Sequence, residues 1–182
     1  MRNKKMNVTL RLGKKTEIHQ LEKLYDDVNE YLEANINYPG WKKGIYPTRE
    51  DAENGIEEGT LYVAEAAGEI VGSLILRHKP EPAYASATWQ TDVEYEKILV
   101  IYTFVVDPKK QGQGIGRKML EQIEELAKNL RMRALRLDVY EKNTPAIHLY
   151  QKCGFQYIGT VSLGLEEIGL NWFQLYEKLV EV

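Results

Sequence analysis

The first 77 residues alternate between the spacing typical of strands and the spacing typical of helices. Residues 8–12 alternate apolar and polar side chains, which predicts a first strand. Over residues 16–34 the apolar positions recur at helical spacing, which predicts an amphipathic helix with the leading threonine as its N-cap. A second threonine is expected to cap a short helix over residues 48–58. Two β-like runs, 61–65 and 69–77, flank an Ala-Gly pair and predict a hairpin.

The second half of the chain centres on a nearly continuous apolar run over residues 97–107. Such a run is typical of a strand buried on both faces. Periodicity further predicts an edge strand over 83–90, helices over 116–130 and 145–153, and strands over 134–140, 155–161 and 172–179. The main elements follow the order β-α-α-β-β-β-α-β-α-β-β, which indicates a mixed α/β sheet with helices packed on it.

Composition narrows the class of protein without identifying it. The 182 residues suit a single domain over residues 1–182, with 43% hydrophobic and 28% charged side chains. A net charge of −3 argues against a nucleic-acid binder, and the most apolar stretch has nine residues where a membrane span needs about 20. The single cysteine, Cys153, excludes an internal disulfide and a cysteine-rich zinc site. These features predict a cytoplasmic protein that binds neither nucleic acid nor membrane.

The chemically informative segment is FVVDPKKQGQGIGR, residues 104–117, which lies between the buried strand and an amphipathic helix. The start of a helix presents unpaired N–H groups and a partial positive charge, and glycines let the backbone approach an anion closely. A diphosphate is the natural occupant of such a loop. A plain strand-to-helix turn is the simpler interpretation, but a turn rarely needs three glycines in five residues.

Three phosphate-binding patterns can be compared with this loop. A Walker A loop requires Gly-Lys-Ser/Thr, whereas Gly116 is followed by arginine. The dinucleotide pattern G-x-G-x-x-G fails in both registers, because its third glycine would fall at Arg117 or at Met119. Asp138 nevertheless lies about where that pattern places an acid that binds a ribose. The third pattern, Gln/Arg-x-x-Gly-x-Gly/Ala, is met by residues 111–116.

Residues 137–155, LDVYEKNTPAIHLYQKCGF, add a strand, an asparagine and a helix that ends in Leu-Tyr-x-x-x-Gly-Phe. Together with the glycine loop and the Val-Asp-Pro before it, this segment resembles the GNAT superfamily of N-acetyltransferases over residues 98–155; the N-terminal half resembles it by element order alone. The resemblance implies a mixed, mostly antiparallel central sheet of about six or seven strands flanked by about four helices. It also implies acetyl-CoA as cosubstrate. The three histidines are scattered along the chain and offer no metal site, so no metal is expected.

The cofactor site implied by the resemblance is built mainly from backbone. The residues expected to line the pantetheine arm and the acetyl group are Phe104, Val105 and Val106. The residues expected to hold the diphosphate are Gln111, Gly112, Gln113, Gly114, Ile115, Gly116 and Arg117. Asn143 is expected to contact coenzyme A, and Ala146 to allow its close approach. A solvated Arg117 and a simple N-capping role for Asn143 stay open as alternatives.

Tyr150 matches the family's tyrosine that protonates the departing thiolate. A phenol has a reference pKa of about 10, so it stays protonated at neutral pH and can donate a proton. Packing in the core beside Ile147 is the alternative role. A thiol mechanism through Cys153 and His148 is disfavoured, because two residues five apart on one short helix do not face each other well.

The general base is harder to assign. Many family members place a glutamate near the start of the buried strand, where this chain has Ile98 or Val100. Glu96, just upstream, is therefore the provisional base. Other candidates are Glu94, Asp92 and Tyr102. A solvated acidic loop is the simpler interpretation of this segment.

The acceptor amine is expected to contact the N-terminal half of the chain. Residues 35–47 and 84–95 are rich in aromatic side chains that could line a pocket, pack in the core or contact a homodimer partner. A small-molecule amine is the first expectation, because the strand glutamate is missing. A protein N-terminus is the alternative, since the Leu-Tyr segment also resembles ribosomal-protein alanine acetyltransferases. A non-catalytic binder of acyl-coenzyme A also stays open.

Overall fold

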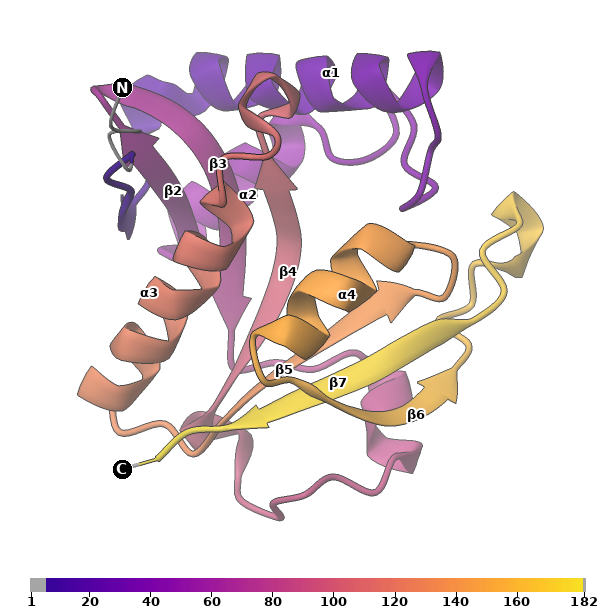
Figure 1. Cartoon of the computed structure of the whole chain (residues 1–182). Coiled ribbons are helices and arrows are strands. Elements are labelled where there is room, and N and C mark those ends of the chain that lie inside the picture. The colour runs from indigo at the N-terminus through magenta and orange to yellow at the C-terminus, as the bar shows by residue number, and fades with distance from the viewer. Residues whose placement is uncertain (1–5, 182) are drawn as a thin grey trace. The chain divides into compact units, whose positions relative to one another are not determined.

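The computed structural model describes residues 6–181, which form seven strands and four α-helices (Figure 1). The helices are α1 (Ile18–Ala34), α2 (Arg49–Glu58), α3 (Ile115–Asn129) and α4 (Thr144–Lys152). The strands are β1 (Thr9–Leu12), β2 (Leu61–Ala66), β3 (Glu69–Arg77), β4 (Ile98–Val106), β5 (Ala134–Tyr140), β6 (Gln156–Val161) and β7 (Phe173–Leu179). Apart from the edge strand predicted over residues 83–90, their types and order are those predicted, with ends that differ by at most two residues. Within residues 6–181, no helix has the length and apolar character needed to cross a membrane.

The strands form one sheet in the order β1-β2-β3-β4-β5-β7-β6. The pairs β1–β2, β2–β3, β5–β7 and β6–β7 are antiparallel, whereas β4 and β5 run parallel. The predicted mixed, mostly antiparallel sheet with four helices is therefore confirmed. The central position of β4 explains its apolar sequence, because residues 98–101 are all buried.

The described chain divides into two compact units, each with its own core. The first unit comprises the chain up to Asn35, Trp41–Ile75 and Thr103–Ile123. Its buried apolar side chains include Leu21, Tyr25, Ala52 and Val63 from α1, α2 and β2. The second unit comprises Ile36–Gly40, Leu76–Tyr102 and the chain from Glu124 onward. One of its buried clusters consists of Tyr84, Ile98, Val100, Ala134 and Leu175. The single domain expected over residues 1–182 stays a prediction.

The two predicted N-caps have different outcomes. Thr48 does cap α2: its backbone N–H donates to the Asp51 carboxylate at 2.7 Å. The prediction for Thr16 is wrong, because a short 3₁₀ turn over Lys15–Glu17 precedes α1. The Glu17 carboxylate holds this turn by accepting hydrogen bonds from the Lys14 N–H at 2.9 Å and from the Arg11 guanidinium at 2.9 and 2.7 Å.

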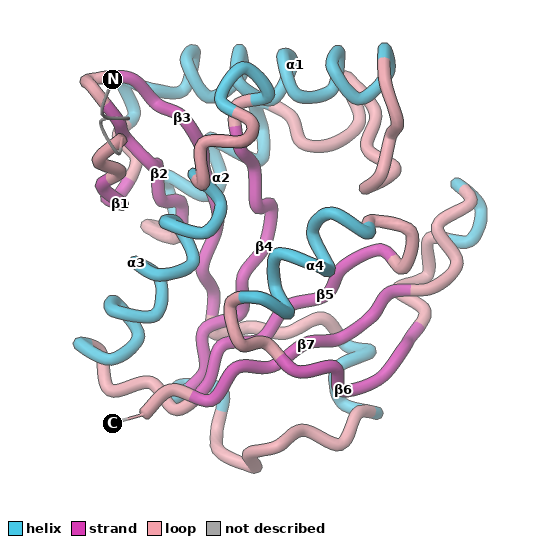
Figure 2. The backbone as a smooth tube through the Cα atoms, viewed as in Figure 1, coloured by secondary structure: helices cyan, strands magenta, loops and turns pink. Residues whose placement is uncertain are grey.

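The edge strand predicted over residues 83–90 is also wrong. A 3₁₀ helix spans Pro82–Ser86, and the following residues form irregular loop (Figure 2). Local hydrogen bonds satisfy this backbone: the Tyr84 N–H donates to the Glu81 carbonyl at 3.0 Å, and the Ala87 N–H to the Tyr84 carbonyl at 3.2 Å. Tyr84, one of the residues that suggested a strand, instead lies fully buried in the core.

Candidate active site

The ladder between β4 and β5 is shorter than either strand. It runs from the pair Ile98–Ala134 to the pair Ile101–Leu137. Both strands continue beyond these pairs, β4 as far as Val106 and β5 as far as Tyr140. Asp138 is therefore the first residue of β5 after the end of the ladder.

Thr103 interrupts the regular backbone of β4. Its φ of +49° lies in the left-handed region, which β-branched residues rarely adopt. Its Oγ1 lies 2.5 Å from the hydroxyl of Tyr46, and Asn29 Nδ2 in turn donates to the Tyr46 carbonyl at 3.1 Å. Side chains far apart in sequence thus support an unfavourable conformation directly before Phe104. Backbone strain of this kind clusters at functional sites.

Gly72 lets α3 lie close to β3 and β4. A Cβ at this position would lie 2.7 Å from Met119 Sδ and 2.8 Å from the Val105 carbonyl oxygen. Both distances are too short for real contacts, so only glycine fits here. The close packing fixes the first turns of α3 beside the last residues of β4.

The predicted phosphate loop connects these two elements. Gly112 and Gly114 have φ values of +76° and +72°, and a Cβ on either would meet nothing within 4 Å. Residues 111–114 are exposed, whereas Ile115 opens α3 with its side chain buried. The first helical bond runs from the Lys118 N–H to the Gly114 carbonyl at 3.1 Å. The N–H groups of residues 115–117 therefore have no acceptor inside α3, as at any helix start.

Two side chains of this loop already have protein partners. Gln111 Oε1 accepts a hydrogen bond from the Tyr31 hydroxyl at 3.2 Å, which ties the loop to α1. Arg117 is 73% exposed and pairs with Glu121 at 3.2 Å, one helical turn on. This placement agrees with the solvated alternative for Arg117. Its backbone N–H still belongs to the helix start.

In the second unit, Asn143 directly precedes α4 and Tyr150 lies on it. Asn143 caps the helix, because its Oδ1 accepts from the Ala146 N–H at 3.4 Å. Tyr150 is buried on the inner face, and its ring centroid lies 5.8 Å from that of Phe155. Burial raises the pKa of Tyr150, and the negative charge of Asp138 raises it further. The phenol is therefore a proton donor rather than a phenolate at neutral pH.

Asp138 is an acidic group that the sequence did not assign to proton transfer. The residue is partly exposed, but its carboxyl group is desolvated, and Oδ2 accepts a hydrogen bond from the Tyr84 hydroxyl at 2.6 Å. Burial raises the pKa of Asp138 to about 6, the hydrogen bond from Tyr84 opposes the rise, and the charge of Glu81 adds to it. A carboxylate whose pKa approaches neutrality is suited to general-base chemistry.

The sequence alone considered Asp138 only as a ribose-binding acid. One signal for a different role was available, because the residue stands in the apolar run ALRLDVY, in the strand directly before the helix that carries Tyr150. The desolvation of its carboxyl group could not be foreseen. Tyr84, whose hydroxyl contacts this carboxyl group, belongs to the segment that the sequence placed in an edge strand.

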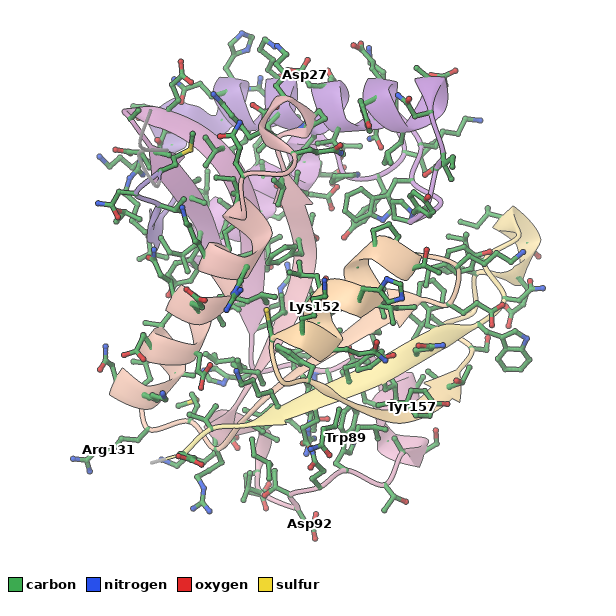
Figure 3. All side chains as sticks on the ribbon, in the orientation of Figure 1. Asp27, Trp89, Asp92, Arg131, Lys152 and Tyr157 are labelled. Carbon is green, nitrogen blue, oxygen red and sulfur yellow. The ribbon has the colours of Figure 1, made fainter. Side chains whose placement is uncertain are left out.

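The carboxylates expected from the sequence lie at the start of β4. Glu96 is exposed in the 3₁₀ turn Tyr95–Lys97, and Asp92 is exposed and points away from the ribbon (Figure 3). Tyr102 donates to the Lys79 carbonyl at 2.7 Å, and burial raises its pKa. A base role for Glu96 stays a prediction. Among the described residues, no group of three or more His, Cys, Asp and Glu side chains is arranged to hold a metal ion.

The two aromatic segments have separate surroundings. In the first unit, Trp41 packs edge-on against Tyr46 at a centroid distance of 5.6 Å. In the second, the Arg136 guanidinium lies 4.2 Å from the ring centroid of Trp89 and 5.1 Å from that of Tyr95. A hollow of about 430 Å³ adjoins this cluster. The residues lining it include Tyr84, Trp89, Thr91, Asp92, Tyr95 and Arg136. Tyr84 is a core residue, whereas Trp89 and Tyr95 are half-buried and line this hollow. An acceptor pocket in this segment stays a prediction.

Comparison with known sequences gives a family match. A sequence model of the acetyltransferase (GNAT) family matches residues 21–155. Mycothiol acetyltransferase of Acidothermus cellulolyticus is 31% identical over 108 residues, covering 59% of this chain and 33% of that protein. Spermine/spermidine N(1)-acetyltransferase of Bacillus subtilis is 38% identical over 66 residues, covering 36% of this chain and 43% of that protein. Each match spans less than half of the relative's own length.

Solved structures share the whole fold. A GNAT-family acetyltransferase of Streptococcus agalactiae superimposes with a TM-score of 0.76 at 24% identity, covering 96% of both chains. The ribosomal-protein-S18-alanine N-acetyltransferase of Escherichia coli gives a TM-score of 0.68 at 14% identity, covering 97% of this chain and 95% of that one. An acetyltransferase of Salmonella typhimurium, solved with its cofactor acetyl-CoA, gives 0.65 at 16% identity with the same coverage.

Proposed function

The chain belongs to the acetyltransferase (GNAT) family, and we propose that it is an N-acetyltransferase that transfers the acetyl group of acetyl-CoA directly to the primary amine of a small molecule. The observation that carries the proposal is the loop over residues 111–116. It combines two left-handed glycines, an open backbone and the start of α3. This combination fits a diphosphate.

Residues of the first unit are proposed to hold acetyl-CoA. The open faces of Gly112 and Gly114 let a diphosphate reach the backbone, and the N–H groups of residues 115–117 supply donors. Residues 104–106 of β4 would pair with the extended, amide-bearing arm as with an added strand. The Salmonella typhimurium neighbour, which shares the fold at 16% identity, was solved with its cofactor acetyl-CoA.

Asp138 is proposed to accept the proton of the attacking amine. An alkylammonium with a pKa of about 10.4 is neutral in only about one part in 2,500 at neutral pH, so reaching the free amine costs roughly 4–5 kcal/mol. An ordinary carboxylate is a weak base for this purpose, whereas a pKa of about 6 brings Asp138 closer to the working pH. Glu96, the base expected from the sequence, is the alternative.

Tyr150 is proposed to protonate the departing sulfur. Its raised pKa keeps the phenol protonated at neutral pH, which a proton donor requires. A backbone N–H near Val106 would polarise the thioester carbonyl. Holding donor and acceptor together would supply much of the rate acceleration.

A small-molecule amine is the proposed acceptor. The Bacillus subtilis relative acts on spermine and spermidine by name, and it matches 36% of this chain. The Escherichia coli alanine N-acetyltransferase shares the fold at 14% identity, which carries no substrate argument. A cytoplasmic location and a homodimer stay predictions.

The first test compares Gly114→Ala with Gly68→Ala. Both glycines have a left-handed φ, and a new Cβ on either would meet open space. Each substitution should therefore lower the free energy of unfolding by a similar amount, roughly 1–2 kcal/mol, through backbone strain. Only the alanine at position 114 would occupy the space of the diphosphate. We therefore expect acetyl-CoA affinity to fall at least about tenfold in Gly114→Ala, a loss of about 1.4 kcal/mol, and to be unchanged in Gly68→Ala.

Thermal melts with acetyl-CoA, and with NAD as comparator, would measure this difference. Acetyl-CoA at 100-fold its dissociation constant should stabilise the unsubstituted protein by about 2.7 kcal/mol, or roughly 5–10 °C. Free thiol release with a panel of amines then tests the transfer. A melting shift with NAD alone would overturn the cofactor. Binding without thiol release would indicate a non-catalytic module, and turnover of peptides alone would indicate a protein N-terminal acceptor.

A further inference from the structure

Tyr84 places a hydroxyl group on the carboxylate that the proposed reaction uses as base. The side chain is fully buried, and its OH donates to Asp138 Oδ2 over 2.6 Å. The two residues come from different elements, the 3₁₀ helix Pro82–Ser86 and strand β5. A short bond from a buried phenol to a carboxylate restricts the carboxylate to one orientation.

Tyr84 is itself held rigidly. Trp89 Nε1 donates to the Tyr84 carbonyl at 3.0 Å, and the centroids of the two rings are 5.3 Å apart. Arg136 in turn holds Trp89 in place. Its guanidinium lies 4.2 Å from the Trp89 ring centroid and pairs with the buried Glu177 at 2.7 Å. Arg136 lies on β5, the strand that also carries Asp138, and Glu177 lies on the neighbouring strand β7. The Tyr84 hydroxyl is thereby fixed relative to Asp138.

Other charged and titratable groups around Asp138 interact with it through their charges. Glu81, beside the same 3₁₀ helix, raises the pKa of Asp138 by its negative charge. Burial raises the pKa values of Tyr150 on α4 and Tyr102 on β4, and the negative charge of Asp138 adds to both rises. On β7 the residue paired with Asp138 is the apolar Leu175. The hydroxyl of Tyr84 contacts the Asp138 carboxylate directly, by the hydrogen bond of 2.6 Å.

We propose that Tyr84 is a positioning residue of the acid–base pair: its hydroxyl orients the Asp138 carboxylate and stabilises the charged form that accepts the proton. The proposal rests on Asp138 being the base. Burial drives the pKa of Asp138 up, and the bond from Tyr84 limits the rise. Without this bond the carboxylate would be protonated over more of the neutral range and would turn toward other donors.

The decisive variant is Tyr84→Phe, measured by the pH dependence of kcat/KM and by a ¹³C NMR titration of the Asp138 carboxyl. Loss of a charge-assisted hydrogen bond should move the acid limb of the profile and the measured pKa upward together by about one pH unit. In Tyr84→Phe, activity should fall less at pH values above the acid limb than at pH values below it. A merely structural role would lower activity at all pH values and leave the limb in place.

Tyr95→Phe is the matched control. It removes a hydroxyl from the same segment, one that accepts from Arg136 Nη1 at 2.9 Å rather than donating to Asp138. We expect it to leave the acid limb and the pKa of Asp138 where they are. A fluorinated tyrosine at position 84 keeps the shape and donates more strongly, so it should shift both downward even if Tyr84→Phe folds poorly.

Asp138→Asn separates failure of this proposal from failure of the proposed base. If Asp138→Asn keeps the pH profile of the unsubstituted protein, Asp138 is not the base, whatever Tyr84 does. If Asp138→Asn loses activity while neither substitution at Tyr84 moves the pKa of Asp138, the positioning role is overturned. The positioning role is supported if the acid limb and the pKa of Asp138 move together, upward in Tyr84→Phe and downward in the fluorinated variant.

Discussion

Thr103 adopts a backbone conformation that its own side chain disfavours. A β-branched residue in the left-handed region costs of order 1–3 kcal/mol, which surrounding contacts must offset. The contact with the Tyr46 hydroxyl at 2.5 Å is such an offset, and Asn29 fixes the Tyr46 backbone in turn. Together they hold the chain in place directly before the residues proposed to line the acetyl group.

A double-mutant cycle on Thr103 and Tyr46 tests this interaction. Thr103→Val keeps the branched shape but removes the hydroxyl that contacts Tyr46, so it should lower the free energy of unfolding by about 1 kcal/mol. Tyr46→Phe should cost a similar amount. Since both remove the same contact, we expect the double variant to show a coupling of about 1 kcal/mol in urea unfolding. Thr103→Gly, which removes the strain, is the control, and strictly additive effects would contradict the interaction.

Sequence and structure agree best for residues whose roles depend on neighbours in the chain. The N-capping alternative for Asn143 and the protonated state of Tyr150 both follow from local pattern and from the reference pKa of a phenol. The predicted contact of Asn143 with coenzyme A stays a prediction. Asp138 and Thr103 were missed because their states depend on distant partners. The partner of Asp138 is 54 residues away in Tyr84, and that of Thr103 is 57 residues away in Tyr46. A single sequence does not show which residues far apart in the chain come into contact.

At the scale of elements, the segment that replaces the predicted edge strand is held by one ion pair. Arg136 and Glu177 are 3% and 0% exposed and lie 2.7 Å apart on the neighbouring strands β5 and β7. Arg136 also donates to the Thr91 carbonyl at 2.7 Å, and Glu177 accepts from the Gln90 N–H at 2.7 Å. The pair therefore substitutes for a strand ladder in fixing residues 89–95.

Removing one member of this pair should be costly. Arg136→Met leaves the Glu177 carboxylate buried without its cation, and we expect the free energy of unfolding to fall by about 3–5 kcal/mol. Replacing both, as Arg136→Met with Glu177→Leu, should cost clearly less because no lone charge stays buried. Denaturant unfolding gives both values, and protease cleavage within residues 89–95 should rise in either variant. A double variant as unstable as the single one would contradict this account.

The elements themselves were largely predictable. The apolar periodicity of α1, α3 and α4 and the turn residues of the β2–β3 hairpin are local signals, and the ends predicted from them differ by one or two residues. The prediction of an edge strand failed because residues 83–90 form 3₁₀ bonds instead of a ladder. The segment is also bound to the sheet by the Tyr84 hydroxyl on Asp138 of β5 and by the Gln90 N–H on Glu177 of β7. Tertiary contacts decided that segment, as they decided the start of α1.

At the scale of the whole molecule, Asp138 gives stability an unusual dependence on pH. Its pKa is about 6 in the folded protein and about 3.9 in the unfolded chain. Between these values the folded state keeps a proton that the unfolded state has released, so the free energy of unfolding falls as pH rises through this window. A difference of about two pKa units corresponds to about 3 kcal/mol lost at neutral pH. Most carboxylates have the opposite effect, because folding usually lowers their pKa.

Asp138→Asn removes this titration, and its effect on stability should therefore depend on pH. Asparagine keeps an oxygen that can accept from Tyr84 but cannot ionise, so the variant should be more stable than the unsubstituted protein by about 2–3 kcal/mol at neutral pH and about equally stable near pH 4. Urea unfolding across this range measures the difference, with the exposed Asp92→Asn as control. A pH-independent difference would show that the carboxyl is not desolvated. If Asp138→Asn is more stable but loses acetyl transfer, Asp138 is a group kept for catalysis at the expense of stability. A buried acid with a purely structural role would not show this combination.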